Sequence, residues 1–129
     1  MLTNAGRDVV AAQVLGAGGT ATAKYMAVTA NSTAPAAGDT ALTGEITTAG
    51  GGLLRAIATY AHTNGTNTAT LTKTFTANGS DSLPVTLAKI GILDAASAGN
   101  LVFATLLSST ATLSASGDST TITDTVTIS

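Results

Sequence analysis

Threonines occupy every second position along two stretches of the chain, residues 68–76 and residues 121–127. Side chains of a β-strand point alternately to opposite faces, so each stretch places its threonines on one face of a strand. The other face of the first stretch is mostly apolar, with Leu71 and Phe75. Threonine also favours extended backbone through its restricted χ1 angle. The pattern predicts two strands, one over residues 66–77 and one from residue 121 to the end of the chain, each with a row of hydroxyls on one side.

Turn-forming residues divide the rest of the chain into short segments. Asn64-Gly65 separates two β-prone runs, which predicts a hairpin. Further strands are expected over residues 24–30, 53–63, 83–93, 101–107 and 110–115. Residues 101–107 are nearly all apolar, which predicts burial on both faces. About seven short strands favour a mainly β fold, an antiparallel β-sandwich or jelly roll. A β-solenoid is the alternative, although the strand spacings show no fixed repeat.

One short helix is expected near the N-terminus, over residues 4–15. Asn4 is a suitable N-cap, and glycines from Gly16 onward end the helix. Its apolar side, which would pack on a sheet, comprises Val10, Ala11, Val14 and Leu15. We therefore divide the chain into an N-terminal arm with its linker, residues 1–22, and a single β-sandwich domain, residues 23–129.

Charged residues make up only 9% of the chain, against about 25% in ordinary proteins. The net charge is −2 and the five Lys and Arg residues are scattered, so nucleic-acid binding is not expected. No stretch approaches the ~18 apolar residues of a membrane span. There is no cysteine, which excludes disulfides and thiolate metal sites. An uncharged polar surface is desolvated at low cost, which favours packing against other subunits.

Residues suited to catalysis are few and dispersed. His62 is the single histidine and lies beside the Asn64-Gly65 turn, where a solvated hairpin histidine is expected. Nothing marks a pair of carboxylates for acid–base work. We predict no enzymatic activity, no cofactor and no metal site. The segment 78–81 could offer oxygen ligands to calcium, but it lacks the spaced acidic residues of a calcium loop.

The candidate interface combines part of the first threonine row with three charged residues: Thr70, Thr72, Thr74, Lys73, Arg7 and Asp8. The threonine row has three interpretations: the solvated side of a sheet, a contact surface for neighbouring subunits, or an ice-binding array of hydroxyls. Lys73 falls on the apolar side of its strand. It is either a lysine of an edge strand whose ammonium group reaches solvent or a member of an ion pair between subunits.

Two sets of segments carry a resemblance to a known family. The first comprises NAGRD at 4–8, YMAVT at 25–29, APAAGDTALTGE at 34–45, and Arg55. The second comprises AKIGILDAA at 88–96, GNL at 99–101 and SGD at 116–118. Together they resemble small structural proteins of tailed bacteriophages, which are described as capsid decoration (cement) proteins or as tail-fibre-like proteins.

The resemblance implies a β-sandwich or jelly-roll module that sits on the virion, often as a trimer. The chain has neither a long repetitive stalk nor a separate anchoring domain, so we expect a capsid decoration protein that binds and stabilises the major capsid shell. We also expect a homo-oligomer, with a trimer favoured, whose residues 2–15 reach a neighbouring subunit. The alternatives are a tail or tail-fibre component that binds surface glycans, and a hydrolase of cell-wall sugars.

Overall fold

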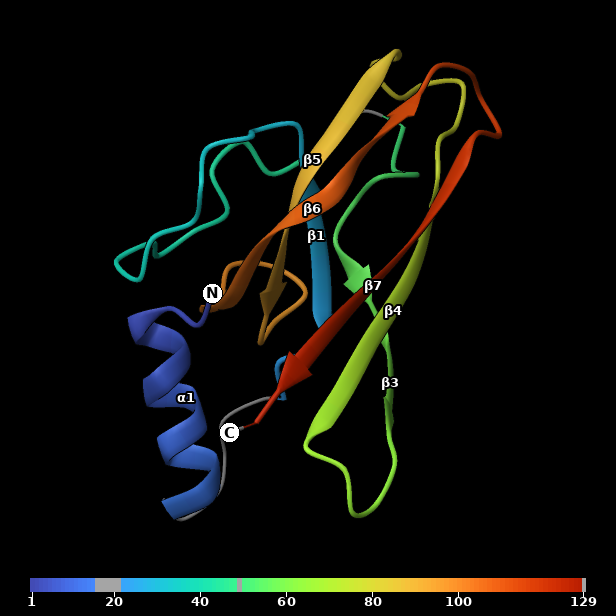
Figure 1. The fold of residues 1–129 in the computed structure, drawn as a ribbon. Coiled ribbons are helices and arrows are strands. Elements are labelled where there is room, and N and C mark those ends of the chain that lie inside the picture. Colours follow the sequence, from blue (N-terminus) through green and yellow to red (C-terminus); the bar gives the residue numbers. More distant parts are fainter. Residues whose placement is uncertain (16–21, 49, 129) are drawn as a thin grey trace.

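The computed structural model describes residues 1–15, 22–48 and 50–128. Over these residues the chain forms the elements α1 (Asn4–Leu15), β1 (Tyr25–Thr29), β2 (Ala56–Ile57), β3 (Thr59–His62), β4 (Thr68–Thr76), β5 (Val85–Leu93), β6 (Leu101–Leu113) and β7 (Ser119–Thr127). The expected fold class is confirmed: the protein is a mainly β antiparallel sandwich with one short helix near its N-terminus (Figure 1). No helix in the described part of the chain has the length and apolar character needed to span a bilayer.

The strands form two antiparallel sheets that face each other (Figure 1). The first sheet has the order β2-β1-β5-β6 and the second has the order β3-β4-β7. The chain passes from the first sheet to the second between β2 and β3, at the buried residue Ala58. β7 pairs with β4 along its whole length, from Thr68 opposite Thr127 to Thr76 opposite Ser119.

The inward faces of the two sheets share one hydrophobic core. Its larger buried side chains are Met26, Val28, Leu71, Phe75, Leu87, Ile90, Ile92 and Ile122. A second cluster forms where Leu42, in the loop after β1, packs with Leu93 and Leu101. β5 is therefore buried over most of its length, and its sequence shows a nearly continuous apolar run rather than an alternation.

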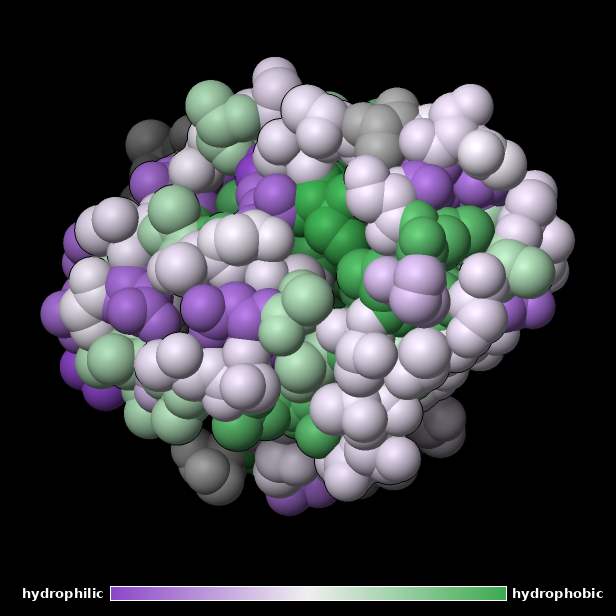
Figure 2. Space-filling view, turned by 90° about the horizontal axis from the view of Figure 1, so that it is seen from above, coloured by the Kyte–Doolittle hydropathy of each residue, from purple (hydrophilic) through white to green (hydrophobic). Residues whose placement is uncertain are grey.

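The surface of the sandwich carries few charges. Seen from the end that is uppermost in Figure 1, pale residues of intermediate hydropathy cover most of the molecule, and strongly hydrophilic residues form small separate groups (Figure 2). Hydrophobic side chains are visible at the centre of this end, between the surrounding polar ones. This distribution follows from a composition in which only 9% of residues are charged.

The strand expected over residues 53–63 is in fact divided between the two sheets. Residues 56 and 57 form β2 and pair with β1, whereas β3 pairs with β4. The prediction of one continuous strand was wrong because the turn from sheet to sheet occurs at Ala58, which carries no turn signal. The predicted hairpin is confirmed: the amide N–H of Thr66 donates to the carbonyl O of Thr63, with N and O 3.1 Å apart, and Gly65 has φ of 87°.

The two strands expected over 101–107 and 110–115 form one irregular strand, β6. Leu106 pairs with Lys89 and Ala111 pairs with Leu87, so residues 107–110 bulge out of the register. The predicted burial of residues 101–107 on both faces is correct only at the start of β6, since Leu106 is 39% exposed. The reason is that β6 is an edge strand, and the N-terminal segment bonds to it only as far as residue 104.

The N-terminal residues 1–3 lie extended along the first part of β6. Leu2 forms a bridge with Phe103, and the amide N of Thr3 is 3.0 Å from the carbonyl O of Val102. Thr3, rather than the expected Asn4, caps α1, because its Oγ1 accepts a hydrogen bond of 2.9 Å from the amide of Gly6. The N-terminal segment is therefore bonded to the first sheet.

The buried side of α1 also differs from the expected one. Val9 is 6% exposed whereas Val10, which the sequence placed on the packed side, is 44% exposed. Gly6 lies so close to β6 that a Cβ atom would overlap the carbonyl O of Val102, and this close approach sets the rotation of the helix. The linker was predicted over residues 16–22. Its residues 16–21 and the side chains of residues 11–15 lie outside the described residues. The expected boundary at residue 22 stays a prediction.

Candidate functional site

The outward face of the second sheet consists of small uncharged residues. Leu71, Phe75 and Ile122 point into the core, so the alternate positions of the same strands point outward. These outward positions are Thr59 and Ala61 in β3, Thr68, Thr70, Thr72, Thr74 and Thr76 in β4, and Ser119, Thr121, Thr123, Thr125 and Thr127 in β7. We call these twelve positions the threonine face.

Hydroxyl groups of the threonine face bond to one another across the strands. The Oγ1 atoms of Thr72 and Thr123 are 3.1 Å apart, and those of Thr74 and Thr121 are 2.7 Å apart. Both pairs join residues that are directly opposite in the antiparallel register. Because each of these four hydroxyls keeps a protein partner, water can be removed from them at less cost than from unpaired polar groups.

Three of the predicted interface residues lie on the threonine face, and one lies on the opposite, core-facing side of the same sheet. Thr70, Thr72 and Thr74 follow one another along the outer side of β4. Lys73 is opposite Ile122 on the core side and is half-buried. The idea that Lys73 belongs to an edge strand was wrong, because β4 is the central strand of its sheet.

The other two predicted interface residues, Arg7 and Asp8, are not brought to this face. Both are exposed on α1, which packs against β6 of the first sheet. Arg7 contacts Asn4 within the same helix, with Nη1 and Oδ1 3.4 Å apart. The threonines of β7 belong to the same face and were not among the predicted interface residues. Their strict alternation over residues 121–127 is the signal that could have found them.

A groove of about 360 Å³ lies where the edge strands β6 and β7 diverge. Ile90, Leu107 and Ile122 contribute apolar side chains to it, and Asp124 projects into it from the core side of β7. Asp124 is only 8% exposed. Burial raises the pKa of the Asp124 carboxyl above its ordinary value of 3.8, and the positive charge of the N-terminus opposes this shift only in part.

We expect replacement of Asp124 by asparagine to stabilise the protein at neutral pH. With a raised folded-state pKa, the folded state binds more protons than the unfolded state just above pH 3.8, so burial of this carboxyl lowers stability as pH rises through that window. The gain in Asp124→Asn should therefore shrink to near zero when pH falls below 3.8. Urea unfolding at several pH values, followed by circular dichroism, measures this gain.

Asp118 provides a control of opposite sign. Its carboxylate accepts amide hydrogen bonds from Ala115 and Ser114, and these bonds lower its pKa. Asp118→Asn should therefore lower stability at neutral pH, with a loss that diminishes in acid. A gain for Asp124→Asn that stays constant across the pH range would contradict the effect of burial on its charge.

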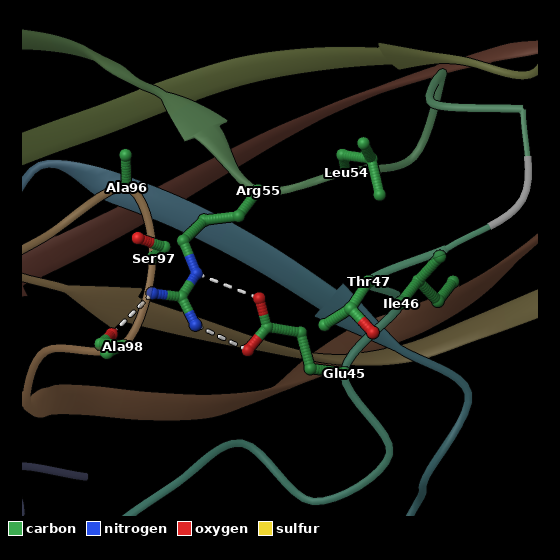
Figure 3. Close-up of a pocket in the computed structure, with 8 residues that line it drawn as sticks. All are labelled: Glu45, Ile46, Thr47, Leu54, Arg55, Ala96, Ser97 and Ala98. Atoms are coloured by element: carbon green, nitrogen blue, oxygen red, sulfur yellow. Dashed lines mark hydrogen bonds and ion pairs between the residues drawn. The ribbon is translucent and has the colours of Figure 1, made fainter.

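Arg55 and Glu45 form an ion pair that lines a pocket of about 260 Å³ (Figure 3). The Nε–Oε1 distance is 2.8 Å and the Nη2–Oε2 distance is 2.6 Å, so the pairing is bidentate. The two side chains are 11% and 12% exposed. The third nitrogen of Arg55, Nη1, donates to the carbonyl O atoms of Ala95 at 3.0 Å and Ala98 at 2.7 Å.

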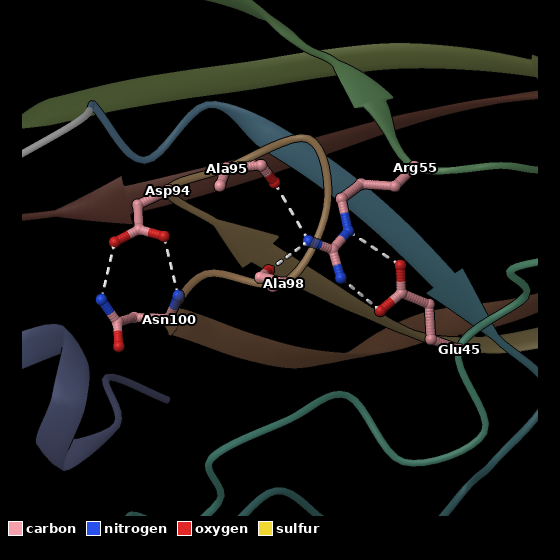
Figure 4. A network of polar contacts seen from close by, with 6 residues as sticks. All are labelled: Glu45, Arg55, Asp94, Ala95, Ala98 and Asn100. Carbon is pink, nitrogen blue, oxygen red and sulfur yellow. Dashed lines mark hydrogen bonds and ion pairs between the residues drawn. The ribbon is translucent and has the colours of Figure 1, made fainter.

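The loop that receives Arg55 is closed by its own polar contacts (Figure 4). The Asp94 carboxylate accepts a hydrogen bond of 2.7 Å from the amide N of Asn100 and one of 2.8 Å from its Nδ2. Arg55 therefore joins the segment around Glu45 to the loop between β5 and β6. Because the ionised groups of the pocket neutralise each other, the arrangement is suited to fixing loops rather than to acid–base chemistry.

The residues singled out for catalysis or metal binding do not converge. His62 is exposed at the end of β3, with Nδ1 2.8 Å from the carbonyl O of Thr68. In the segment 78–81, Oδ2 of Asp81 accepts a hydrogen bond from the amide of Asn78 at 2.8 Å. Among the residues that the structure describes, no three His, Cys, Asp or Glu side chains are grouped as metal ligands would be.

Comparison of the sequence with protein-family models and with curated proteins gives no match. The resemblance to phage structural proteins stays a prediction. The features of the molecule that bear on its function are the threonine face, the sheet edges and the sparse distribution of charge.

Proposed function

We propose that the protein is a non-enzymatic structural subunit of a bacteriophage virion. In this proposal it is a capsid decoration (cement) protein that binds the major capsid shell from outside and stabilises it. The observation that carries the proposal is the threonine face, where three neighbouring strands present Thr, Ala or Ser at all twelve outward positions. Such a face can pack against another subunit without burying a charge.

The hydroxyl pairs of the threonine face favour this use. Thr72 with Thr123 and Thr74 with Thr121 retain a hydrogen bond when the face loses its water. Burial of an unpaired hydroxyl costs about 1–3 kcal/mol in proteins, so the pairs remove part of the penalty of association. The methyl groups of the same threonines add apolar area to the contact.

One sheet edge favours association between copies of the chain, because among the described residues no strand pairs with the outer side of β7. β7 is nine residues long and lies at the edge of the second sheet. It contains neither proline nor lysine, and its one charged residue is Asp124 on the core side. Proteins usually protect exposed edges with such residues, with bulges or by covering the edge. β6 has a bulge and is bonded to residues 1–3, whereas β3 is only four residues long. We propose that β7 takes part in the homo-oligomer, for which a trimer is favoured.

The test is binding of the purified protein to capsid shells of the phage that carries its gene. We expect binding in a fixed stoichiometry and a higher temperature of shell disruption. Thr72→Glu places a carboxylate at the centre of the threonine face and should lower the affinity more than about ten-fold, because the charge would be desolvated on binding.

A matched control is available on the first sheet. Thr112 is exposed and its hydroxyl is 2.9 Å from that of Thr86, as in the pairs of the threonine face. Thr112→Glu should leave binding unchanged. Failure of the unmodified protein to bind shells would overturn the proposal, and equal losses for both variants would remove the role of the threonine face. Antibody labelling of tails rather than heads in electron micrographs would instead favour the tail component.

A further inference from the structure

The chain contains two Asn-Gly pairs, and the fold places them in opposite environments. Asn64-Gly65 lies at the tip of the β3–β4 hairpin, and Asn78-Gly79 lies in the turn after β4. A glycine after asparagine leaves the peptide nitrogen unhindered and its backbone free to rotate. We propose that Asn64 is a site of spontaneous deamidation in the folded protein and that Asn78 is protected from the same reaction.

The reaction needs water and no cofactor. The peptide nitrogen of Gly65 attacks Cγ of Asn64, a C–N bond forms, and the side-chain nitrogen leaves as ammonia with the proton of the peptide N–H. The product is a five-membered succinimide ring. Water then adds to one of the two ring carbonyls and breaks its bond to nitrogen. One opening gives aspartate at residue 64, and the other gives isoaspartate, in which the main chain runs through the former side-chain carbonyl.

The surroundings of Asn64 leave room for this ring. Residues 63–67 are all exposed, and the side chain of Asn64 has no hydrogen bond to any residue that the structure describes. A Cβ atom built on Gly65 would meet nothing within 4 Å. The turn is closed by the bond of 3.1 Å from the amide N of Thr66 to the carbonyl O of Thr63. The amide of Asn64 can therefore rotate toward the following peptide nitrogen.

The surroundings of Asn78 oppose the reaction. Its Nδ2 donates to the carbonyl O of Gly50, its Oδ1 accepts from the amide of Ser80 at 3.0 Å, and its own amide donates to Asp81 at 2.8 Å. The side chain is half-buried, and a Cβ atom on Gly50 would overlap it. The side-chain amide of Asn78 is held by the bonds to Gly50 and Ser80, which oppose its rotation toward the nitrogen of Gly79.

Deamidation would change the charge of a nearly neutral molecule. One new carboxylate takes the formal net charge from −2 to −3, since −2 − 1 = −3. The inference does not depend on the proposed virion function.

Peptide mapping of folded protein kept at mildly alkaline pH tests the inference. Trypsin, which cleaves after Lys and Arg, separates the two sites, because Arg55, Lys73 and Lys89 bound the peptides 56–73 and 74–89. Mass spectrometry should find the amide-to-acid mass change at Asn64, with isoaspartate as a product. We expect a rate more than about ten-fold that at Asn78, which must first open locally.

Two controls make the outcome decisive. In concentrated urea both pairs should react at similar rates, since the sequence Asn-Gly is common to them. Asn64→Gln should remove the modification from peptide 56–73 and leave peptide 74–89 unchanged. The inference is overturned if Asn64 stays intact in the folded protein while it reacts in urea, or if Asn78 reacts as fast as Asn64 in the folded protein.

Discussion

Replacing Arg55 by methionine is expected to lower the free energy of unfolding by about 3 kcal/mol, because removing one partner of a buried ion pair leaves the other charge uncompensated. The change leaves the Glu45 carboxylate without its bidentate partner and removes the donor to the carbonyl groups of Ala95 and Ala98. Both charged side chains are close to nine-tenths buried, so water replaces these bonds poorly. Urea unfolding followed by far-UV circular dichroism measures the loss.

Arg7 is the matched control, because it is an exposed arginine with one long contact to Asn4. Arg7→Met should change stability by less than about 0.5 kcal/mol. A double variant, Glu45→Met with Arg55→Met, should be more stable than Arg55→Met alone, since no unpaired charge remains buried. A small effect of Arg55→Met would show that the ion pair does not hold the two loops.

Replacing Phe75 by alanine is expected to cost about 3–5 kcal/mol, the usual range for a large buried side chain. Phe75 is 1% exposed and lies in the core shared by both sheets. The free energy of unfolding of a small domain is about 5–15 kcal/mol in total. The variant should therefore unfold at a much lower urea concentration.

Tyr60 is the aromatic control in the same sheet. It lies on the adjacent strand β3 opposite Leu71 and is 63% exposed. Tyr60→Ala should cost less than about 1 kcal/mol, because little of its area leaves water on folding. Equal losses for the two variants would contradict the placement of the core between the sheets.

The strands with the clearest alternation were predicted closely from the sequence. The strands that contain residues 68–76 and 121–127 were found because threonine alternates with mostly apolar residues along them. This period of two residues reflects the two faces of a strand. The helix over residues 4–15 was also found, from local capping and glycine signals. Its cap was misplaced by one residue, since both Thr3 and Asn4 are good capping residues, and the hydrogen bonds that hold Thr3 on β6 join distant segments.

The structural features that were not predicted from the sequence depend on contacts between distant segments. The transition between sheets at Ala58 follows from the pairing of β2 with β1 and of β3 with β4, and no local signal marks it. The exposure of Leu106 depends on the position of β6 at a sheet edge.

The candidate site was only partly predictable for the same reason. The row containing Thr70, Thr72 and Thr74 was recognised from its period, but its partner row in β7 requires the antiparallel register. Lys73 was placed on the correct side of its strand and assigned to the wrong position in the sheet. The partnership of Arg55 with Glu45 and with the loop at 94–100 joins residues that no motif connects.

The strand order has a consequence for how the chain acquires its structure. β4 has its full-length partner in β7, and β1 has its partner in β5, so most pairing joins segments separated by dozens of residues. Folds dominated by such distant contacts typically form in about milliseconds to seconds. During synthesis Leu71 and Phe75 lack one neighbouring strand until residues 119–127 leave the ribosome. Nascent chains stalled before that point should be the form most prone to aggregation.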